Sequence, residues 1–442
     1  MSAGDSLAGV MACLLGGLLN STWPLFVSET APKLIGLNRN TKEGGWAWEN
    51  SWFVFTFMQV AVNIAFCVAV LGKRCASAVA FTLPRPSPPH LTGTQTLAEV
   101  YAAASTKDLS LVCFFSFMWG FGVMFYSLGI RMLGAGLGIA LQMSLLTIIG
   151  TLLPLIEDYK DDIGSPAAIV TIIGLVLGLA GFVCGAYSSS LKDYGDPEPG
   201  TGAARGLIMC SDGGLSTHSS VLSLVCALPH LSAKAGEGVV EEGKEVVEEG
   251  TAAPVARQID ATPAAAPLWL GIAVCVAGAV TASMLQFSFV YGSNLVAYAE
   301  EELGVAKVFA PLVVWLLAFS LAGMWNVVYA SWLLTTNRTW KRFPKPGGGF
   351  PGIRYVLLPL VMGTAFVAHI HLYGVAQALF GNLGEVISWP LLMTSTVLCG
   401  HVWGYRLGEW KNAPRKAITV NIVSTMLLIA AVAVIAVAGG AL

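Results

Sequence analysis

Polar and aromatic side chains recur at helical spacing where the chain enters its second apolar run. Intervals of 3, 4, 3 and 4 residues separate the members of this stripe, which are Glu49, Trp52, Thr56, Gln59 and Asn63. Residues spaced in this way lie on one face of an α-helix. Their amides and hydroxyls can bond the hydroxyls of a ligand, an indole can stack on its C–H surface, and a carboxyl can take a proton. The stripe predicts a helix face that lines a polar binding site.

Similar side chains occupy four other apolar runs. His369, Tyr373 and Gln377 follow one another at i, i+4 and i+8, so they share one helix face. Polar groups inside a membrane are costly and usually face the interior of a helix bundle or a wet cavity. We therefore expect amides, hydroxyls and indoles from several helices to converge on one sugar. The remaining members of this expected site are Trp119, Tyr126, Gln142, Ser388 and Trp389.

Three ionisable side chains are candidates for carrying a coupled proton, namely Glu49, His369 and Glu385. His369 has the stronger claim because it lies near the centre of its run. Plainer alternatives stay open: Glu49 as a first-turn helix charge, and His369 as a neutral histidine bonded to a neighbour. A lone amide in such a run also joins helices more often than it binds a ligand. We expect no catalytic residue, metal site or cofactor.

The composition indicates that most of the surface faces lipid. Of the 442 residues 55% are hydrophobic and only 11% are charged, against roughly 25% charged residues in soluble domains. The formal net charge of −2 disfavours a nucleic-acid partner. The nine cysteines include no CxxC pair, so buried thiols are expected rather than disulfides or a metal site.

Ten apolar runs are long enough to cross a bilayer, which takes about 20 residues. They are too long and continuous for a β-barrel, so the expected fold is all-α and integral to the membrane, with ten helices. The first run is interpreted as a retained span rather than a signal peptide. The runs lie near 7–27, 50–72, 109–130, 133–156, 164–187, 268–296, 308–334, 353–380, 384–405 and 416–440.

A long polar interval divides the runs into five and five. Residues 188–267 are expected to form a disordered linker between a first five-helix repeat, 1–187, and a second, 268–442. A weak internal match supports the repeat, because a Tyr late in one run is followed eight residues later by a Gly in both halves. An odd number of crossings makes the second copy inverted, which is typical of transporters.

Two short-range patterns make narrower predictions. Arg131 separates the third and fourth runs, so a very tight turn is expected there, at the membrane surface. Small residues at i and i+4 predict close helix packing. This spacing occurs at Gly174–Gly178, Gly181–Gly185 and Gly400–Gly404–Gly408.

The positions of Lys and Arg predict the orientation. Loops after odd-numbered runs, the linker left out, hold thirteen of these residues and the opposite loops hold six. Cytoplasmic loops carry the excess of Lys and Arg, so we expect both termini outside and the linker in the cytoplasm. The expected membrane is the plasma membrane. The glycosylation sequon at Asn337 then lies on the cytoplasmic side.

Four segments resemble the L-rhamnose–proton symporter family of the drug/metabolite transporter superfamily. They are WAWENSWFVF (46–55), FMWGFGVMFYSLGIRMLGAGLGIAL (117–141), VISWPLLMTSTVLCG (386–400) and LGEWKNAPRKAITV (407–420). The resemblance covers all ten runs and implies a ten-helix carrier that moves L-rhamnose or a related deoxy sugar with protons. The family pattern has a Gln where His369 stands, a departure that bears on substrate choice.

Two other functions stay open. One is the role of another superfamily member, such as exchange of nucleotide sugars in an internal membrane. The diphosphate of such a substrate would require basic residues in the cavity. Arg131 and Lys307 lie at the ends of runs and are poor candidates. An integral-membrane enzyme is a weaker alternative. His369 and His371 resemble a metal-ligand pair, but residues two apart on a helix point to nearly opposite faces. The expected partners are a sugar, protons and lipid.

Overall fold

The computed structural model describes residues 3–26, 46–71, 92–157, 164–194, 268–343, 354–381 and 384–440, and within these ranges it contains helices and no strand. The predicted linker lies outside them, apart from its first seven residues, 188–194. The elements are α1 (Ala3–Thr22), η1 (Trp23–Phe26), α2 (Trp48–Leu71), α3 (Gly93–Ala103), α4 (Thr106–Glu157), α5 (Pro166–Tyr194), α8 (Leu268–Tyr291), α9 (Ser293–Glu301), α10 (Leu312–Thr336), η4 (Thr339–Arg342), α11 (Arg354–Phe380), α12 (Gly384–Leu407) and α13 (Arg415–Ala438).

Nine helices in the described ranges are long and apolar enough to cross a membrane, and a shorter apolar helix covers Leu141–Ile156. The all-α membrane class is thereby confirmed. Polar side chains of the spanning helices are mostly buried, while many of the exposed side chains are large and apolar, as expected for a surface that faces lipid. On α2, for example, Asn63 is fully buried and Gln59 is 4% exposed, whereas Phe57 is 60% exposed.

The helix α4 contains two expected spans and reverses its direction between them. A straight helix of its 52 residues would be about 78 Å long, far more than the ~30 Å hydrocarbon core of a bilayer. A Cβ added at Gly129 would nevertheless lie 3.4 Å from Oε1 of Gln142, although these residues would be about 20 Å apart along a straight axis. A Cβ added at Gly278 of α8 would likewise contact the side chains of both Phe125 and Gln142. The two halves of α4 therefore lie side by side.

The reversal lies between Gly129 and Gln142, in keeping with the tight turn expected at Arg131, although Thr106–Glu157 forms one helical element with no separate loop. Two boundaries differ from the prediction. The fifth run continues as helix to Tyr194, and the sixth breaks at Gly292 between α8 and α9.

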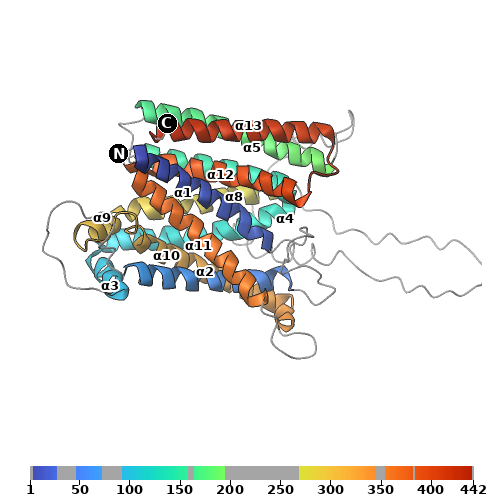
Figure 1. Ribbon diagram of the computed structural model, residues 1–442. Coiled ribbons are helices and arrows are strands. Elements are labelled where there is room, and N and C mark those ends of the chain that lie inside the picture. The colour runs from blue at the N-terminus through green and yellow to red at the C-terminus, as the bar shows by residue number, and fades with distance from the viewer. Residues whose placement is uncertain are drawn as a thin grey trace, which may run out of the picture. The chain divides into compact units, whose positions relative to one another are not determined.

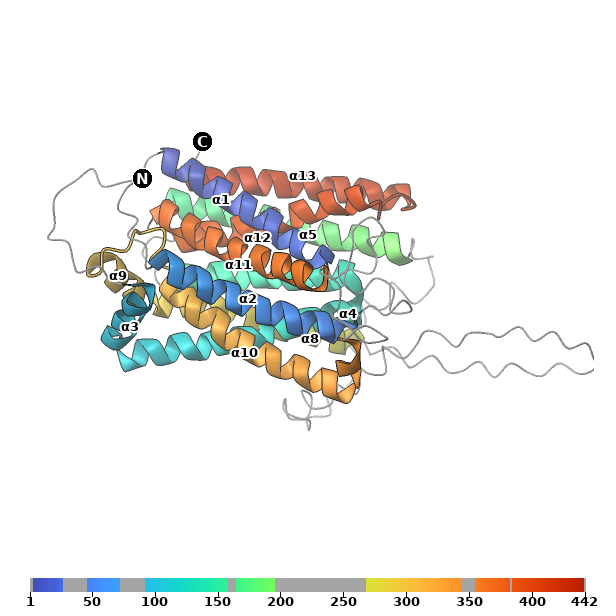
Figure 2. The ribbon, with the colours of Figure 1, turned by 60° about the horizontal axis from the view of Figure 1, so that its bottom comes forward.

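Close helix packing explains many of the glycines. Figure 1 shows α5 and α13 side by side, and Gly174 and Gly181 of α5 face Ile435 and Leu428 of α13. The expected stripe on α12 is wrong: within the described ranges nothing lies within 4 Å of a Cβ at Gly400. In Figure 2, α1 lies across α11 and α12, while α2 runs along α10. The polar side chains discussed next lie on α2, α4, α8, α10, α11 and α12.

Candidate functional site

The α2 stripe is buried over its whole length, as its spacing predicts. Its five members are at most 7% exposed. The indole N–H of Trp52 donates to Oδ1 of Asn326 on α10 across 3.2 Å. Asn326 in turn donates to the carbonyl of Gly120 on α4 across 3.2 Å. One amide therefore joins three spanning helices.

An aromatic cluster lies beside this stripe and centres on Phe366 of α11. Trp119 lies parallel to Phe366 with ring centroids 6.5 Å apart, and Phe319 meets Phe366 edge-on at 5.8 Å. Trp23 stacks on Phe55 at 4.9 Å and also contacts Phe366. Such offset and edge-to-face contacts are favourable for aromatic pairs. Trp119 thus packs against other rings in this structure, with 6% of its surface exposed.

Three side chains form a hydrogen-bonded amide–tyrosine network between α8 and α11. The hydroxyl of Tyr373 donates to Oε1 of Gln286 across 2.6 Å and accepts from Nε2 of Gln377 across 2.9 Å. All three are buried. Among the described residues, Nε2 of Gln286 and Oε1 of Gln377 meet no hydrogen-bond partner. The network therefore retains one spare donor and one spare acceptor inside the helix bundle.

Trp389 of α12 connects this network to the second half of α4. Its ring meets that of Tyr373 edge-on at 5.3 Å, and its indole N–H donates to the carbonyl of Leu146 across 3.2 Å. Ser388 is buried beside it, but its hydroxyl donates to the carbonyl of Gly384 in its own helix. Trp389 therefore contacts the network directly, whereas the Ser388 hydroxyl proton is engaged by its own helix.

Gln142 lies one helical turn before Leu146 and is fully buried. Neither atom of its amide finds a hydrogen-bond partner in the part of the chain that the structure describes. Its Oε1 lies against Gly129, and its Nε2 lies against Gly278 of α8. A buried, unbonded amide costs about 1–3 kcal/mol, so this position favours binding of a hydroxyl-bearing molecule. Tyr126, on the first half of α4, is half-buried.

His369 lies between the aromatic cluster and the amide–tyrosine network. Its ring centroid is 4.9 Å from that of Phe366, and the side chain is 3% exposed. Within the described ranges its Nδ1 has no hydrogen bond of good geometry. Gln59 of α2 is buried as well, and its Oε1 is also unbonded there. The amide oxygen of Gln59 can thus accept a bond from a ligand.

Two of the expected site residues lie elsewhere. Glu49 accepts hydrogen bonds from Asn337 and Thr339, across 3.2 and 2.7 Å, where α10 ends. Asn63 donates to the carbonyl of Trp315 and bonds His371 instead of joining the network. Glu385 is half-buried in the first turn of α12. Glu49 and Asn63 therefore have hydrogen-bond partners outside the amide–tyrosine network.

The structure adds residues to those expected at the site. Gln286 and Asn326 are polar residues of the sixth and seventh apolar runs, and their spacing alone gave no reason to place them in the binding set. Phe366 gives no signal at all, since apolar runs contain many aromatic residues. His371 faces away from His369, as helix geometry predicts, and no group of three His, Cys, Asp or Glu residues suited to a metal occurs in the described part of the chain.

Comparisons with known proteins confirm the resemblance that the motifs predicted. A model of the L-rhamnose–proton symport protein family matches residues 94–240. The L-rhamnose–proton symporters of Yersinia pestis (strain Pestoides F) and Yersinia pseudotuberculosis (serotype O:1b, strain IP 31758) are 23% identical to this chain over 337 residues, which is 75% of this chain and 79% of theirs. That of Yersinia pestis bv. Antiqua is 24% identical over 339 residues.

Proposed function

We propose that this protein is a proton-coupled carrier, not an enzyme, and that it moves L-rhamnose or a related sugar across a membrane by alternating access. Support comes from two independent sources. The relatives named above are L-rhamnose–proton symporters, and the described part of the chain has nine helices that can span a bilayer.

The observation that carries the proposal is the set of buried amides with unused hydrogen-bonding atoms. Gln142 contributes a donor and an acceptor, Gln286 a donor and Gln377 an acceptor, counted against partners in the described ranges. A sugar hydroxyl can both donate and accept. The aromatic face of Trp389, which contacts Tyr373 of this network, suits the C–H surface of a pyranose, and Trp119 is proposed as a second aromatic wall. Gln59 and His369 complete the proposed binding set.

We also propose that the fold consists of two inverted five-helix repeats, with the first extended to Tyr194. If the halves correspond in chain order, α2 pairs with its counterpart α10, and α5 with α13. The packing of α1 on α11 and α12 corresponds to that of α8 on the two halves of α4. The first turn of α1 and the last turn of α13 lie at the same end of the bundle in Figures 1 and 2, in keeping with an even number of crossings.

The orientation proposed from the basic residues puts both termini outside and the linker in the cytoplasm; the proposed membrane is the plasma membrane. Mapping accessible cysteines introduced near Gly4 and near Gly439 in intact cells tests this arrangement. Labelling of both from outside is expected. Protection of both until the cells are opened would reverse the orientation.

Uptake of labelled L-rhamnose into proteoliposomes that contain the purified chain tests the function. Accumulation is expected when the outside is made more acidic than the inside, and it should collapse with a protonophore. Uptake that ignores the gradient would contradict proton coupling. Unlabelled sugars and nucleotide sugars are then added as competitors, and stronger competition by one of them would assign a different substrate.

A further inference from the structure

His371 of α11 lies in a setting quite different from that of His369. Its Nε2 is 3.0 Å from Oδ1 of Asn63 on α2. Its ring stacks on Phe66 with centroids 4.7 Å apart and planes 25° apart. The side chain is half-buried. Two side chains of α2 thus hold the imidazole in a defined orientation.

The bonds of Asn63 determine which nitrogen of His371 carries hydrogen. A backbone carbonyl can only accept, so the Asn63 atom 3.2 Å from the Trp315 carbonyl must be the amide nitrogen. The atom facing His371 is therefore the amide oxygen, which also only accepts. Nε2 of His371 must donate to it, which leaves Nδ1 to accept a proton. One new bond at Nδ1 would then suffice to hold the imidazolium.

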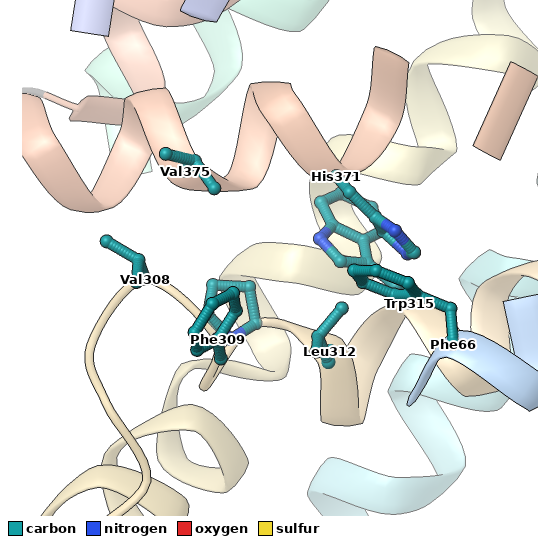
Figure 3. Close-up of a pocket in the computed structure, with 8 residues that line it drawn as sticks. Phe66, Val308, Phe309, Leu312, Trp315, His371 and Val375 are labelled. Atoms are coloured by element: carbon teal, nitrogen blue, oxygen red, sulfur yellow. The ribbon is translucent and has the colours of Figure 1, made fainter. Parts of the chain in front are cut away.

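A small pocket opens beside this imidazole (Figure 3). It is lined by His371, Trp315 and Phe66, together with Val308, Phe309, Pro311, Leu312 and Val375. Its volume of about 40 Å³ holds one or a few waters and is too small for a sugar. The indole N–H of Trp315 is buried, and no acceptor for it lies in the described ranges. A water in the pocket would provide that acceptor.

The surroundings contain few groups that could compete for a proton. From α2, Cys67 points its thiol at Oδ1 of Asn63. From α3, Tyr101 donates to the carbonyl of Val313, and burial raises the pKa of its phenol, so it stays neutral. Lys307, next to Val308, is exposed to solvent. On α11 itself the neighbouring titratable groups are His369 and Tyr373, and the α10 residues that line the pocket are uncharged.

We propose that His371, oriented by Asn63, is the proton-binding site of the carrier and that the small pocket delivers the proton to it. The proposal rests on the proposed symport. In the orientation given above, the loop that contains Val308 and Phe309 lies at the extracytoplasmic end, where a proton that drives sugar uptake must enter. The proton passes from pocket water to Nδ1, and it leaves to the cytoplasmic water when the carrier opens inward. The flat face of Phe66 stabilises the cation by a cation–π contact.

Two assays on the full chain in proteoliposomes separate sugar exchange from proton transport. Counterflow of labelled L-rhamnose needs no gradient and reports sugar exchange. Alkalinisation of the outer medium on addition of L-rhamnose reports proton uptake with the sugar. We expect His371→Gln to retain counterflow while it loses both alkalinisation and gradient-driven accumulation. His401→Gln is the matched control, because His401 is another half-buried histidine, bonded to Thr425 of α13 instead, and it should retain all three activities.

A second variant leaves the imidazole in place. Val308→Trp fills the pocket from its loop, so alkalinisation should slow while counterflow persists. The inference is overturned if His371→Gln keeps alkalinisation in proportion to its counterflow. If His371→Gln loses counterflow as well, the Val308→Trp result decides, and unchanged alkalinisation there overturns the inference. The proposed symport fails separately if the unaltered chain exchanges sugar without any alkalinisation.

Discussion

Trp52 and Asn326 are 274 residues apart in the chain, and a 3.2 Å hydrogen bond from the indole N–H to the amide oxygen joins them. The same amide donates to carbonyls of α4 and of its own helix. This bond ties α2 to α10, and through Asn326 it reaches the glycine-rich first half of α4. If α2, α4 and α10 move together in a transport cycle, the bonds of Asn326 are kept. If they move relative to one another, these bonds must break.

Asn326→Leu is expected to destabilise the protein by about 1–3 kcal/mol, because the buried Trp52 N–H loses its acceptor. Thermal unfolding in detergent, followed by tryptophan fluorescence, measures the effect. Trp52→Phe in the Asn326→Leu background removes the orphaned donor. The double variant should therefore melt higher than the sum of the two single changes predicts. Strict additivity would mean that the bond contributes nothing.

Tyr373→Phe should weaken sugar binding with little loss of fold, because the ring packing against Trp389 is kept and only the hydroxyl is removed. Gln286 and Gln377 then lose the group that holds both amides in place. We expect the half-saturating L-rhamnose concentration in counterflow to rise about tenfold, the effect of one lost hydrogen bond to a buried group.

Tyr187→Phe provides the matched control for that experiment. Tyr187 lies on α5 and is 46% exposed, far from the amide–tyrosine network. Its variant should bind L-rhamnose as the unaltered chain does. If both variants weaken L-rhamnose binding equally, the amide–tyrosine network is not part of the sugar site.

Gln142→Leu should raise stability and lower transport. The buried amide is unbonded to any described residue, so an apolar side chain of similar size removes a cost of about 1 kcal/mol or more. The melting temperature in detergent should rise, while L-rhamnose counterflow should fall. Asn63→Leu is the contrast, because Asn63 uses both ends of its amide and its loss should lower the melting temperature. A fall for Gln142→Leu would show that its amide is already bonded.

Gly122→Ala should destabilise the protein by about 1–3 kcal/mol through overpacking, because a Cβ at this position would overlap the backbone of Ala282 on α8. Gly400→Ala is the matched change on a spanning helix. No described atom lies within 4 Å of its Cβ, so better helix propensity should leave stability equal or slightly higher. Similar melting temperatures for the two variants would contradict the close α4–α8 crossing.

Composition and spacing were sufficient for the membrane class, for most spans and for the buried face of α2. The reason is that lipid penalises any polar group turned outward, so the helical period of Gln59 and Asn63 already decides which side faces inward. The four quoted segments were sufficient for the family resemblance. The same local rules could not locate the break at Gly292 or show that α4 stays helical through Arg131, because those depend on how neighbouring helices pack.

Tertiary structure alone decided which hydrogen-bond partner each buried side chain has. Asn63 shares a stripe with Gln59, yet it bonds a histidine 308 residues later in the chain. Gln286 is one amide in an apolar run until folding brings it within 2.6 Å of the Tyr373 hydroxyl. Periodicity determines which face of a helix a side chain occupies. Only the packing of helices from distant parts of the chain determines what that side chain meets, and hence whether its hydrogen-bonding atoms are used or left for a ligand.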